Sequence, residues 1–211
     1  TLDYRQSYTF DRALSSVHDM AVTENFFIFF DLPLLVENKK ISWLPHKKAR
    51  LVAFNKNFQN PPLEFEIQAC WVFHIINAFE KNGVIHLFAC RWPKYPNEFD
   101  QPHIYEWRLN QASGEVTEHR ISEISAEMPT INPTYNGVCN RYCYTTGSSY
   151  QKADKLSTFD KTDLISGQHT TWDYGSGMVC GEPCFVPDLA PHSALEDQGW
   201  ILNLVTDIKA Q

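Results

Sequence analysis

The strongest constraint on the fold is a strand–turn–strand unit that occurs twice in the sequence. The first copy, residues 104–121, consists of two short strand-like segments around a polar turn with Ser113-Gly114. The second copy, residues 156–172, has Ser166-Gly167 in its turn, and the two turn glycines lie 53 residues apart. That spacing is typical of one blade of a β-propeller. Consecutive four-stranded blades also need no long crossover connection, in contrast to a sandwich.

Other segments favour the same all-β fold class. Apolar runs at residues 25–30 and 50–54, and period-two alternation at residues 63–67, predict short strands. Helical periodicity is nearly absent, and 12 prolines interrupt the chain. We interpret residues 36–48, with their lysines, as a solvated surface loop, and residues 199–207 as one final strand.

Composition excludes several classes of protein. The chain has 211 residues and a net charge of −7, with scattered lysines and arginines, so we expect no nucleic-acid partner. Its apolar runs are too short for a transmembrane helix. The sequence begins at Thr1 with neither a methionine nor a signal-peptide pattern, so we expect a piece of a longer protein.

The six cysteines allow more than one interpretation. Cys139 and Cys143, like Cys180 and Cys184, have three residues between them, a spacing that zinc tolerates. No turn-rich knuckle frames either pair, and the other two cysteines lie in apolar runs. We therefore favour reduced structural thiols over a zinc site or a disulfide framework.

Two histidines, His74 and His18, are candidates for a functional site. His74 lies in an apolar, β-favouring stretch, residues 69–80, where an imidazole needs partners for both ring nitrogens. A metal ion with a carboxylate on the second nitrogen is one solution, and a core histidine bonded to a backbone carbonyl is the other. His18 is either a turn residue bonded by Asp19 or a ligand at a strand end. His86 we interpret as a packing or pore-facing residue rather than a ligand.

Two glutamates stand in apolar surroundings. Glu127 precedes a proline-bounded extended segment, and Glu182 follows a glycine and precedes a proline. A carboxylate in such a place needs a charged or hydrogen-bonding partner. Either glutamate could instead cap a loop by bonding backbone amides.

Taken in order, these segments resemble the carotenoid cleavage oxygenase family, which includes apocarotenoid oxygenases, retinoid isomerase and stilbene-cleaving dioxygenases. The resemblance extends over nearly the whole chain and rests on five motifs: His18-Asp19 with Asp31-Leu32-Pro33, Phe73-His74-Ile75-Ile76-Asn77-Ala78-Phe79-Glu80, Glu127-Met128-Pro129, Arg141-Tyr142-Cys143-Tyr144, and Gly181-Glu182-Pro183 with Glu196-Asp197-Gln198-Gly199-Trp200.

The resemblance implies a seven-bladed propeller with Fe(II) on its axis, held by four histidines. His18 and His74 match the second and third ligands, Glu127 the carboxylate that orients His74, and Glu182 the one that orients the fourth ligand. Phe73, beside His74, is a candidate for lining the substrate tunnel, with core packing as the alternative. The first and fourth ligands would lie outside residues 1–211, since His192 does not match the fourth-ligand motif. We therefore expect a partial domain of three to four blades that is inactive alone.

The function implied is cleavage of a conjugated C=C bond by dioxygen, with a carotenoid-like, apocarotenoid-like or stilbene-like substrate and two carbonyl products. A cleavage-inactive isomerase and a non-catalytic binding propeller remain alternatives. The family also implies peripheral contact with a membrane. The compartment stays open between cytoplasm and plastid, with or without membrane association.

Overall fold

The computed structural model describes residue 7 and residues 17–96, 100–148, 156–188 and 195–210. Within these residues, strands follow one another with a single turn of 3-10 helix, η1, between β11 and β12. The strands are β1 (Met20–Val22), β2 (Phe26–Asp31), β3 (Leu34–Glu37), β4 (Lys40–Trp43), β5 (Ala49–Asn55), β6 (Leu63–Ile67), β7 (Trp71–Lys81), β8 (Val84–Trp92), β9 (His103–Asn110), β10 (Val116–Arg120), β11 (Glu127–Thr130), β12 (Tyr142–Gly147), β13 (Thr158–Asp163), β14 (His169–Asp173), β15 (Met178–Cys180), β16 (Cys184–Pro187), β17 (Gly199–Leu202) and β18 (Val205–Asp207), and η1 is Pro133–Tyr135.

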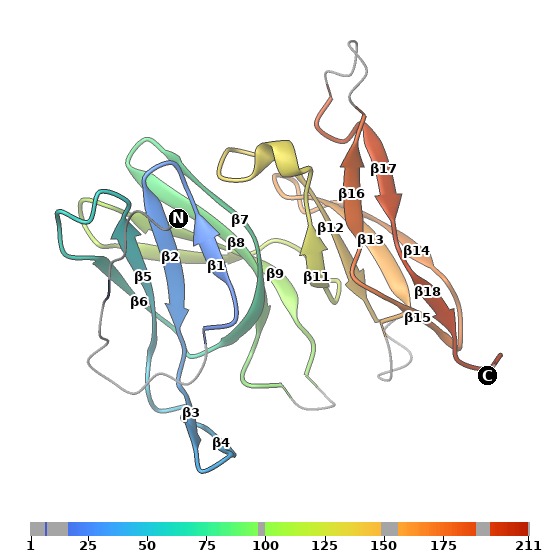
Figure 1. Ribbon diagram of the computed structural model, residues 1–211, viewed down its shortest axis with the longest axis horizontal. Coiled ribbons are helices and arrows are strands. Elements are labelled where there is room, and N and C mark those ends of the chain that lie inside the picture. The colour runs from blue at the N-terminus through green and yellow to red at the C-terminus, as the bar shows by residue number, and fades with distance from the viewer. Residues whose placement is uncertain (1–6, 8–16, 97–99, 149–155, 189–194, 211) are drawn as a thin grey trace, which may run out of the picture.

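Three antiparallel four-stranded sheets follow one another along the chain (Figure 1). Their orders are β1-β2-β5-β6, β7-β8-β9-β10 and β11-β12-β13-β14. A fourth layer consists of two separate two-stranded sheets, one pairing β15 with β18 and the other β16 with β17. The first strands of the three sheets, β1, β7 and β11, contact one another in turn. The prediction of an all-β fold built from consecutive four-stranded units is therefore confirmed.

The repeat found in the sequence forms the outer two strands of the second and third sheets. In β9–β10 the Asn110 side chain accepts hydrogen bonds from the backbone of residues 112 and 113, and in β13–β14 Asp163 does the same for residues 165 and 166. Gly114 and Gly167 close the two turns at φ +72° and +73°, which glycine adopts without strain. The matching serines and glycines thus belong to one turn built twice.

Hydrophobic cores fill the spaces between neighbouring sheets. Strand β8 is buried on both faces: Ile85, Leu87 and Ala89 pack toward the first sheet, whereas Phe88 and Cys90 pack toward the third. A smaller cluster around Tyr144, Phe159 and Phe185 joins the third sheet to the fourth layer. Each sheet therefore buries both faces only when it has a neighbour on each side.

Two predictions about strands were wrong. Of the loop expected at residues 36–48, only residues 44–48 lie outside the β3–β4 hairpin, which residues 34–43 form with Asn38 and Lys39 at positive φ in its tight turn. The sequence has no glycine there, which is why the turn was missed. The expected single strand at residues 199–207 is divided into β17 and β18, and the break lies where the Asn203 side chain bonds the Gly181 carbonyl.

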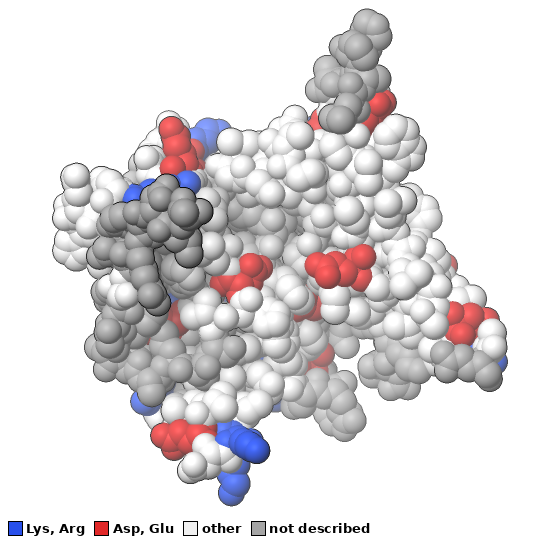
Figure 2. Space-filling view, in the orientation of Figure 1, with Lys and Arg blue, Asp and Glu red and all other residues white. Residues whose placement is uncertain are grey.

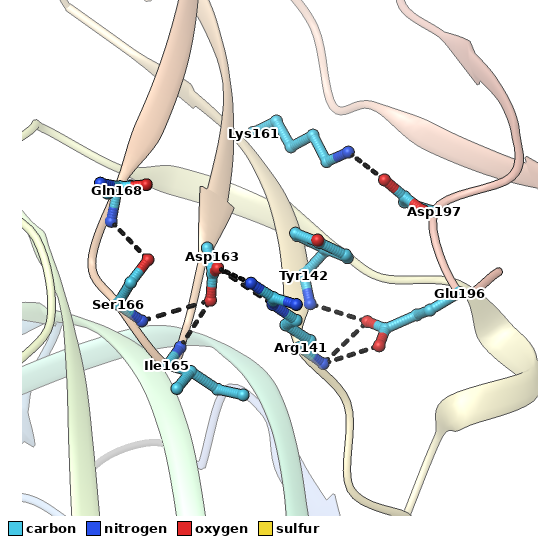
Figure 3. A network of polar contacts seen from close by, with 9 residues as sticks. All are labelled: Arg141, Tyr142, Lys161, Asp163, Ile165, Ser166, Gln168, Glu196 and Asp197. Carbon is cyan, nitrogen blue, oxygen red and sulfur yellow. Dashed lines mark hydrogen bonds and ion pairs between the residues drawn. The ribbon is translucent and has the colours of Figure 1, made fainter.

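Polar contacts fasten the fourth layer to the third sheet (Figure 3). The Glu196 carboxylate accepts hydrogen bonds from the backbone N–H groups of Arg141 at 2.8 Å and Tyr142 at 2.7 Å. Next to it, Lys161 pairs with Asp197, and the Arg141 guanidinium pairs with Asp163 at 2.7 Å. The motifs at residues 141–144 and 196–200 therefore meet in space as a structural clamp.

On the face shown in Figure 2, charged side chains occur in small separate groups and form no continuous basic stripe. The described residues contain no helix of the length and hydrophobicity needed to cross a bilayer.

Candidate metal centre

The two histidines matched to iron ligands lie next to each other. His18 lies just before β1, with Asp19 between them, and His74 lies near the start of β7, the neighbouring first strand. Their ring centroids are 5.2 Å apart and the ring planes meet at 78°. His18 and His74 are 56 positions apart in the sequence, yet their imidazoles lie side by side where the first strands of the sheets contact one another.

An irregularity in β7 sets the direction of His74. The pairing of β7 with β8 shifts register between Val72 and Ile75 and again before Asn77. Such a bulge turns a side chain out of the regular alternation. The Asp19 carboxylate accepts the Ile75 N–H at 2.7 Å and the Met20 N–H at 2.7 Å. Asp19 therefore ties the segment that carries His18 to the bulge that carries His74, instead of serving as the turn partner of the His18 ring.

Glu127 orients the His74 ring. Its Oε2 lies 2.6 Å from Nδ1 of His74 and also accepts the Met128 N–H at 2.9 Å, while its Oε1 accepts the Trp92 indole N–H at 2.6 Å. A carboxylate accepts, so Nδ1 carries a proton, and in the neutral imidazole Nε2 keeps its lone pair. Glu127 is only 5% exposed, and Met128 beside it has φ +50°, an uncommon conformation for a residue other than glycine.

The electrostatic environment favours an electron-rich imidazole. The hydrogen bond to Glu127 raises the pKa of His74, against a smaller opposing effect of burial, and the charges of Glu127, Asp19 and Glu182 add to the increase. Negative charge around a histidine also strengthens its attraction to a cation. These carboxylates therefore suit a metal ion at the free nitrogen.

Glu182 differs from what the sequence predicted. It was expected in a buried setting, but its residue is exposed, in the short connection between β15 and β16. Its carboxylate still lies near enough to His74 to influence the pKa of that ring. Exposure removes the need for a local partner, so its role toward a fourth ligand stays a prediction. His192 lies outside the described residues.

Phe73 is surrounded by aromatic rings. Its centroid lies 5.3 Å from that of His18, 5.4 Å from that of Trp71 and 6.2 Å from that of Trp92. It is partly buried and packs against the core between the first two sheets. These contacts are those of a packing residue that supports the histidines, and a tunnel-lining role stays a prediction.

The imidazoles of His18 and His74 are donors of a kind that suits iron. Neutral imidazoles suit Fe(II), and a carboxylate behind one of them is a usual arrangement in metal sites. Metal–nitrogen bonds of about 2.1 Å are compatible with two rings whose centroids are 5.2 Å apart. Among the described residues no group of three or more His, Cys, Asp or Glu side chains could hold a metal. His18 and His74 would be two of the four expected ligands.

Two further polar residues of the β7 motif have structural roles that the sequence did not reveal. The Asn77 amide bonds the carbonyls of Tyr135 and Val138 and accepts the Gly137 N–H, holding the η1 loop. The Glu80 carboxylate accepts the Thr23 hydroxyl at 2.6 Å and the Asn25 N–H at 2.8 Å, holding the β1–β2 turn. The sequence shows two polar residues three positions apart on one apolar strand, but it does not show their partners, which are distant along the chain.

His86 packs within the second sheet, as one of its two interpretations predicted. Its ring stacks on Phe79 with centroids 4.9 Å apart and planes 11° apart, and its Nδ1 lies 2.7 Å from Oε1 of the buried Glu106. The second oxygen of Glu106 pairs with the Arg108 guanidinium at 2.8 Å.

All six cysteines are free thiols, and Cys139 and Cys184 are exposed whereas the others are buried. Burial raises the pKa of Cys70 to about 12, so this thiol stays protonated at neutral pH.

Three comparisons place the chain among known proteins. A family model described as retinal pigment epithelial membrane protein matches residues 3–211. Carotenoid 9,10(9',10')-cleavage dioxygenase 1 of Phaseolus vulgaris is 30% identical and covers 92% of this chain but 42% of its own length. Apocarotenoid-15,15'-oxygenase of Synechocystis is 26% identical, with 90% and 43% covered. Isoeugenol monooxygenase of Pseudomonas nitroreducens is also 26% identical, with 90% and 46% covered.

The fold has a solved counterpart. The crystal structure of cobalt-substituted Synechocystis apocarotenoid oxygenase superimposes with a TM-score of 0.85 at 24% identity, over 92% of this chain and 45% of that one. The chain thus spans less than half the length of the relatives that it matches. It belongs to the family of the retinal pigment epithelial membrane protein and the carotenoid cleavage oxygenases, and it folds as part of a seven-bladed β-propeller.

Proposed function

We propose that the full-length protein is an Fe(II)-dependent dioxygenase that cleaves a conjugated C=C bond of an apolar substrate. Both atoms of O₂ enter the products, one at each former alkene carbon, which gives two carbonyl compounds. The observation that carries the proposal is the pair of adjacent imidazoles, His18 and His74, the second of which is held at Nδ1 by the buried Glu127 carboxylate.

In this proposal His18 and His74 hold the iron, and the other two ligands come from outside this chain. When bound, the ferrous ion supplies activation of dioxygen next to the alkene. Glu127 keeps the proton of His74 on Nδ1 and raises the basicity of the ring. Glu182 would orient a further histidine. For this reason the 211-residue chain alone is expected to retain iron poorly and to turn over no substrate.

The substrate class follows from the relatives and from the site. The names of the relatives specify carotenoids, an apocarotenoid and isoeugenol, all of which have a C=C bond conjugated to a π-system. Near the histidines, Phe73 packs with Trp71, Trp92 and Tyr95 in an aromatic cluster. An apolar, conjugated alkene is therefore the proposed substrate class.

Peripheral membrane contact is part of the same proposal, because a lipophilic substrate partitions into lipid. The β3–β4 hairpin exposes Val36 and Ile41 opposite each other, with Lys39 and Lys40 at its turn. Vesicle flotation of the full-length protein tests this contact. Replacing Val36 and Ile41 by serine should reduce flotation, and unchanged flotation would exclude the hairpin.

The experiment that tests the function combines metal analysis with product analysis. Purified full-length protein should contain about one iron per chain and should form two carbonyl products from an apocarotenoid, each labelled when ¹⁸O₂ is supplied. His18→Ala should lose iron and cleavage together. Stoichiometric iron with isomerised, unlabelled product would favour an isomerase, and absence of iron from the full-length protein would favour a binding propeller.

A further inference from the structure

We propose that Trp92 is a positioning residue for the metal site: its indole N–H holds the Glu127 carboxylate in the orientation that directs the His74 ring. The inference rests on the proposed metal-binding function. It adds a residue outside the motifs that carry the family resemblance.

The geometry gives each carboxylate oxygen of Glu127 its own donors. Trp92 is the last residue of β8 and pairs with Trp71 across the sheet. Its Nε1 lies 2.6 Å from Oε1 of Glu127, whereas Oε2 receives the His74 and Met128 donors. With Oε1 bound to the indole, rotation of the carboxyl group about its Cγ–Cδ bond would break hydrogen bonds on both sides. The plane of the carboxylate, and with it the direction of the bond to His74, is thereby determined.

Trp92 holds the carboxylate without neutralising it. The donors on Glu127 are an indole, an imidazole and a backbone amide, and no lysine or arginine among the described residues pairs with it. A neutral donor leaves the negative charge in place, where it acts on His74. Because the carboxylate is buried, loss of the indole would leave Oε1 either without a partner or bonded to water in a new geometry.

The indole ring also reaches the second histidine through one intermediate. Trp92 meets Phe73 at 88° with centroids 6.2 Å apart, and Phe73 in turn meets the His18 ring edge to face at 5.3 Å. Trp92 thus supports His74 through its hydrogen bond to Glu127, and His18 through its packing on Phe73. The proposal concerns the hydrogen bond, so its test must preserve an aromatic ring at position 92.

The test uses the full-length protein with Trp92→Phe, which removes the N–H and keeps a ring. Cobalt(II) is the probe, since its visible absorption reports ligand geometry directly. We expect cobalt affinity to fall by about threefold to tenfold, somewhat less than the 10–100-fold typical of removing a direct outer partner of a ligand. The visible absorption bands of bound cobalt should also shift, an effect that general destabilisation would not cause.

Trp107→Phe is the matched control. Trp107 lies on β9 of the same sheet and also donates its indole N–H to a glutamate, Glu118, at 2.9 Å, but its buried ring contacts Phe30 and Tyr105. Its replacement should lower thermal stability and leave cobalt affinity and spectrum unchanged. Equal effects of both variants on the cobalt spectrum would refute a specific role for Trp92.

A folded Trp92→Phe protein with wild-type affinity and spectrum would overturn the inference. Were that variant not to fold, benzothienylalanine at position 92 keeps the size and shape of the indole and removes only the donor. It should show the same loss, and wild-type behaviour would again refute the proposal. Failure of the wild-type protein to bind cobalt would refute the proposed function itself, and this inference with it.

Discussion

Two of the four histidines in the second sheet, His74 and His86, are each bonded through Nδ1 to a buried glutamate, yet only His74 has the surroundings expected of a metal ligand. His74 and Glu127 are 2.6 Å apart, and His86 and Glu106 are 2.7 Å apart. The two pairs differ in what surrounds them. A second imidazole lies beside His74, whereas His86 is stacked flat on Phe79.

The second oxygen of each carboxylate shows a further difference. In Glu127 it accepts a neutral indole N–H, and in Glu106 it pairs with the cation of Arg108. Arg108 satisfies the charge of Glu106 inside the sheet, so little of it remains for a bound ion. A buried histidine–glutamate pair is therefore not by itself a metal site. The neighbouring imidazole of His18 and the uncompensated charge of Glu127 distinguish the two pairs.

The largest expected contrast comes from removing each ring. In the full-length protein, His74→Ala should abolish iron loading and cleavage together, because a ligand is lost. His86→Ala should keep stoichiometric iron and lose only stability, since its ring contributes packing. Iron analysis alongside a cleavage assay measures both effects. Retained cleavage in His74→Ala would refute the proposal that His74, in contrast to His86, binds the metal.

Neutralising each glutamate should give a smaller contrast. Glu127→Gln removes the charge behind His74 and should weaken metal affinity by about 10–100-fold, as is usual for the outer partner of a ligand. Glu106→Gln should leave metal affinity unchanged. Metal titration of both variants decides the matter, and similar losses in the two would mean that the pairs share one role.

The pH dependence of stability should single out Glu106. Burial alone would raise the pKa of Glu106, but hydrogen bonds from Arg108 and His86 outweigh it and lower the pKa below its ordinary value of 4.5. Its stabilising contribution is therefore present above pH 4.5 and is lost as the pH falls below 4.5 through the folded-state value. Urea unfolding of the full-length protein between about pH 3.5 and 7 should show a shallower acid decline in Glu106→Gln than in wild type. Parallel declines would contradict the role of the Arg108 pair.

The smallest contrast concerns the ring beside each histidine. Phe79→Leu removes the ring stacked on His86 and should cost about 1–2 kcal/mol of stability with no change at the metal. Phe73→Leu should cost a similar amount and also shift the visible spectrum of bound cobalt, because Phe73 touches both proposed ligands. Thermal unfolding and cobalt absorption measure the two effects separately. A shift of the cobalt spectrum in Phe79→Leu would contradict the expectation that only the ring beside His74 affects the metal.

The parts of the fold that depend on neighbouring residues could be predicted from the sequence. The turns at Gly114 and Gly167 depend on an Asn or Asp, a serine and a glycine within five residues, so the repeat is visible in the sequence. The proximity of His18 and His74 was expected only through the family resemblance. The bond from Trp92 to Glu127 was not predicted, since no local pattern links residues 35 apart. The β3–β4 hairpin was missed because its turn has Asn38-Lys39 in place of a glycine.

By itself, the sequence determined most of the strands and the turns of the repeat, because these depend on alternation and on the conformational preferences of neighbouring residues. Only the tertiary structure decided that His74 meets a second imidazole while His86 meets a phenyl ring. Strand register and the bulge in β7 set the direction of each side chain, and the adjoining sheet supplies its partner. Both depend on chain segments that are distant in sequence and close only in the folded protein.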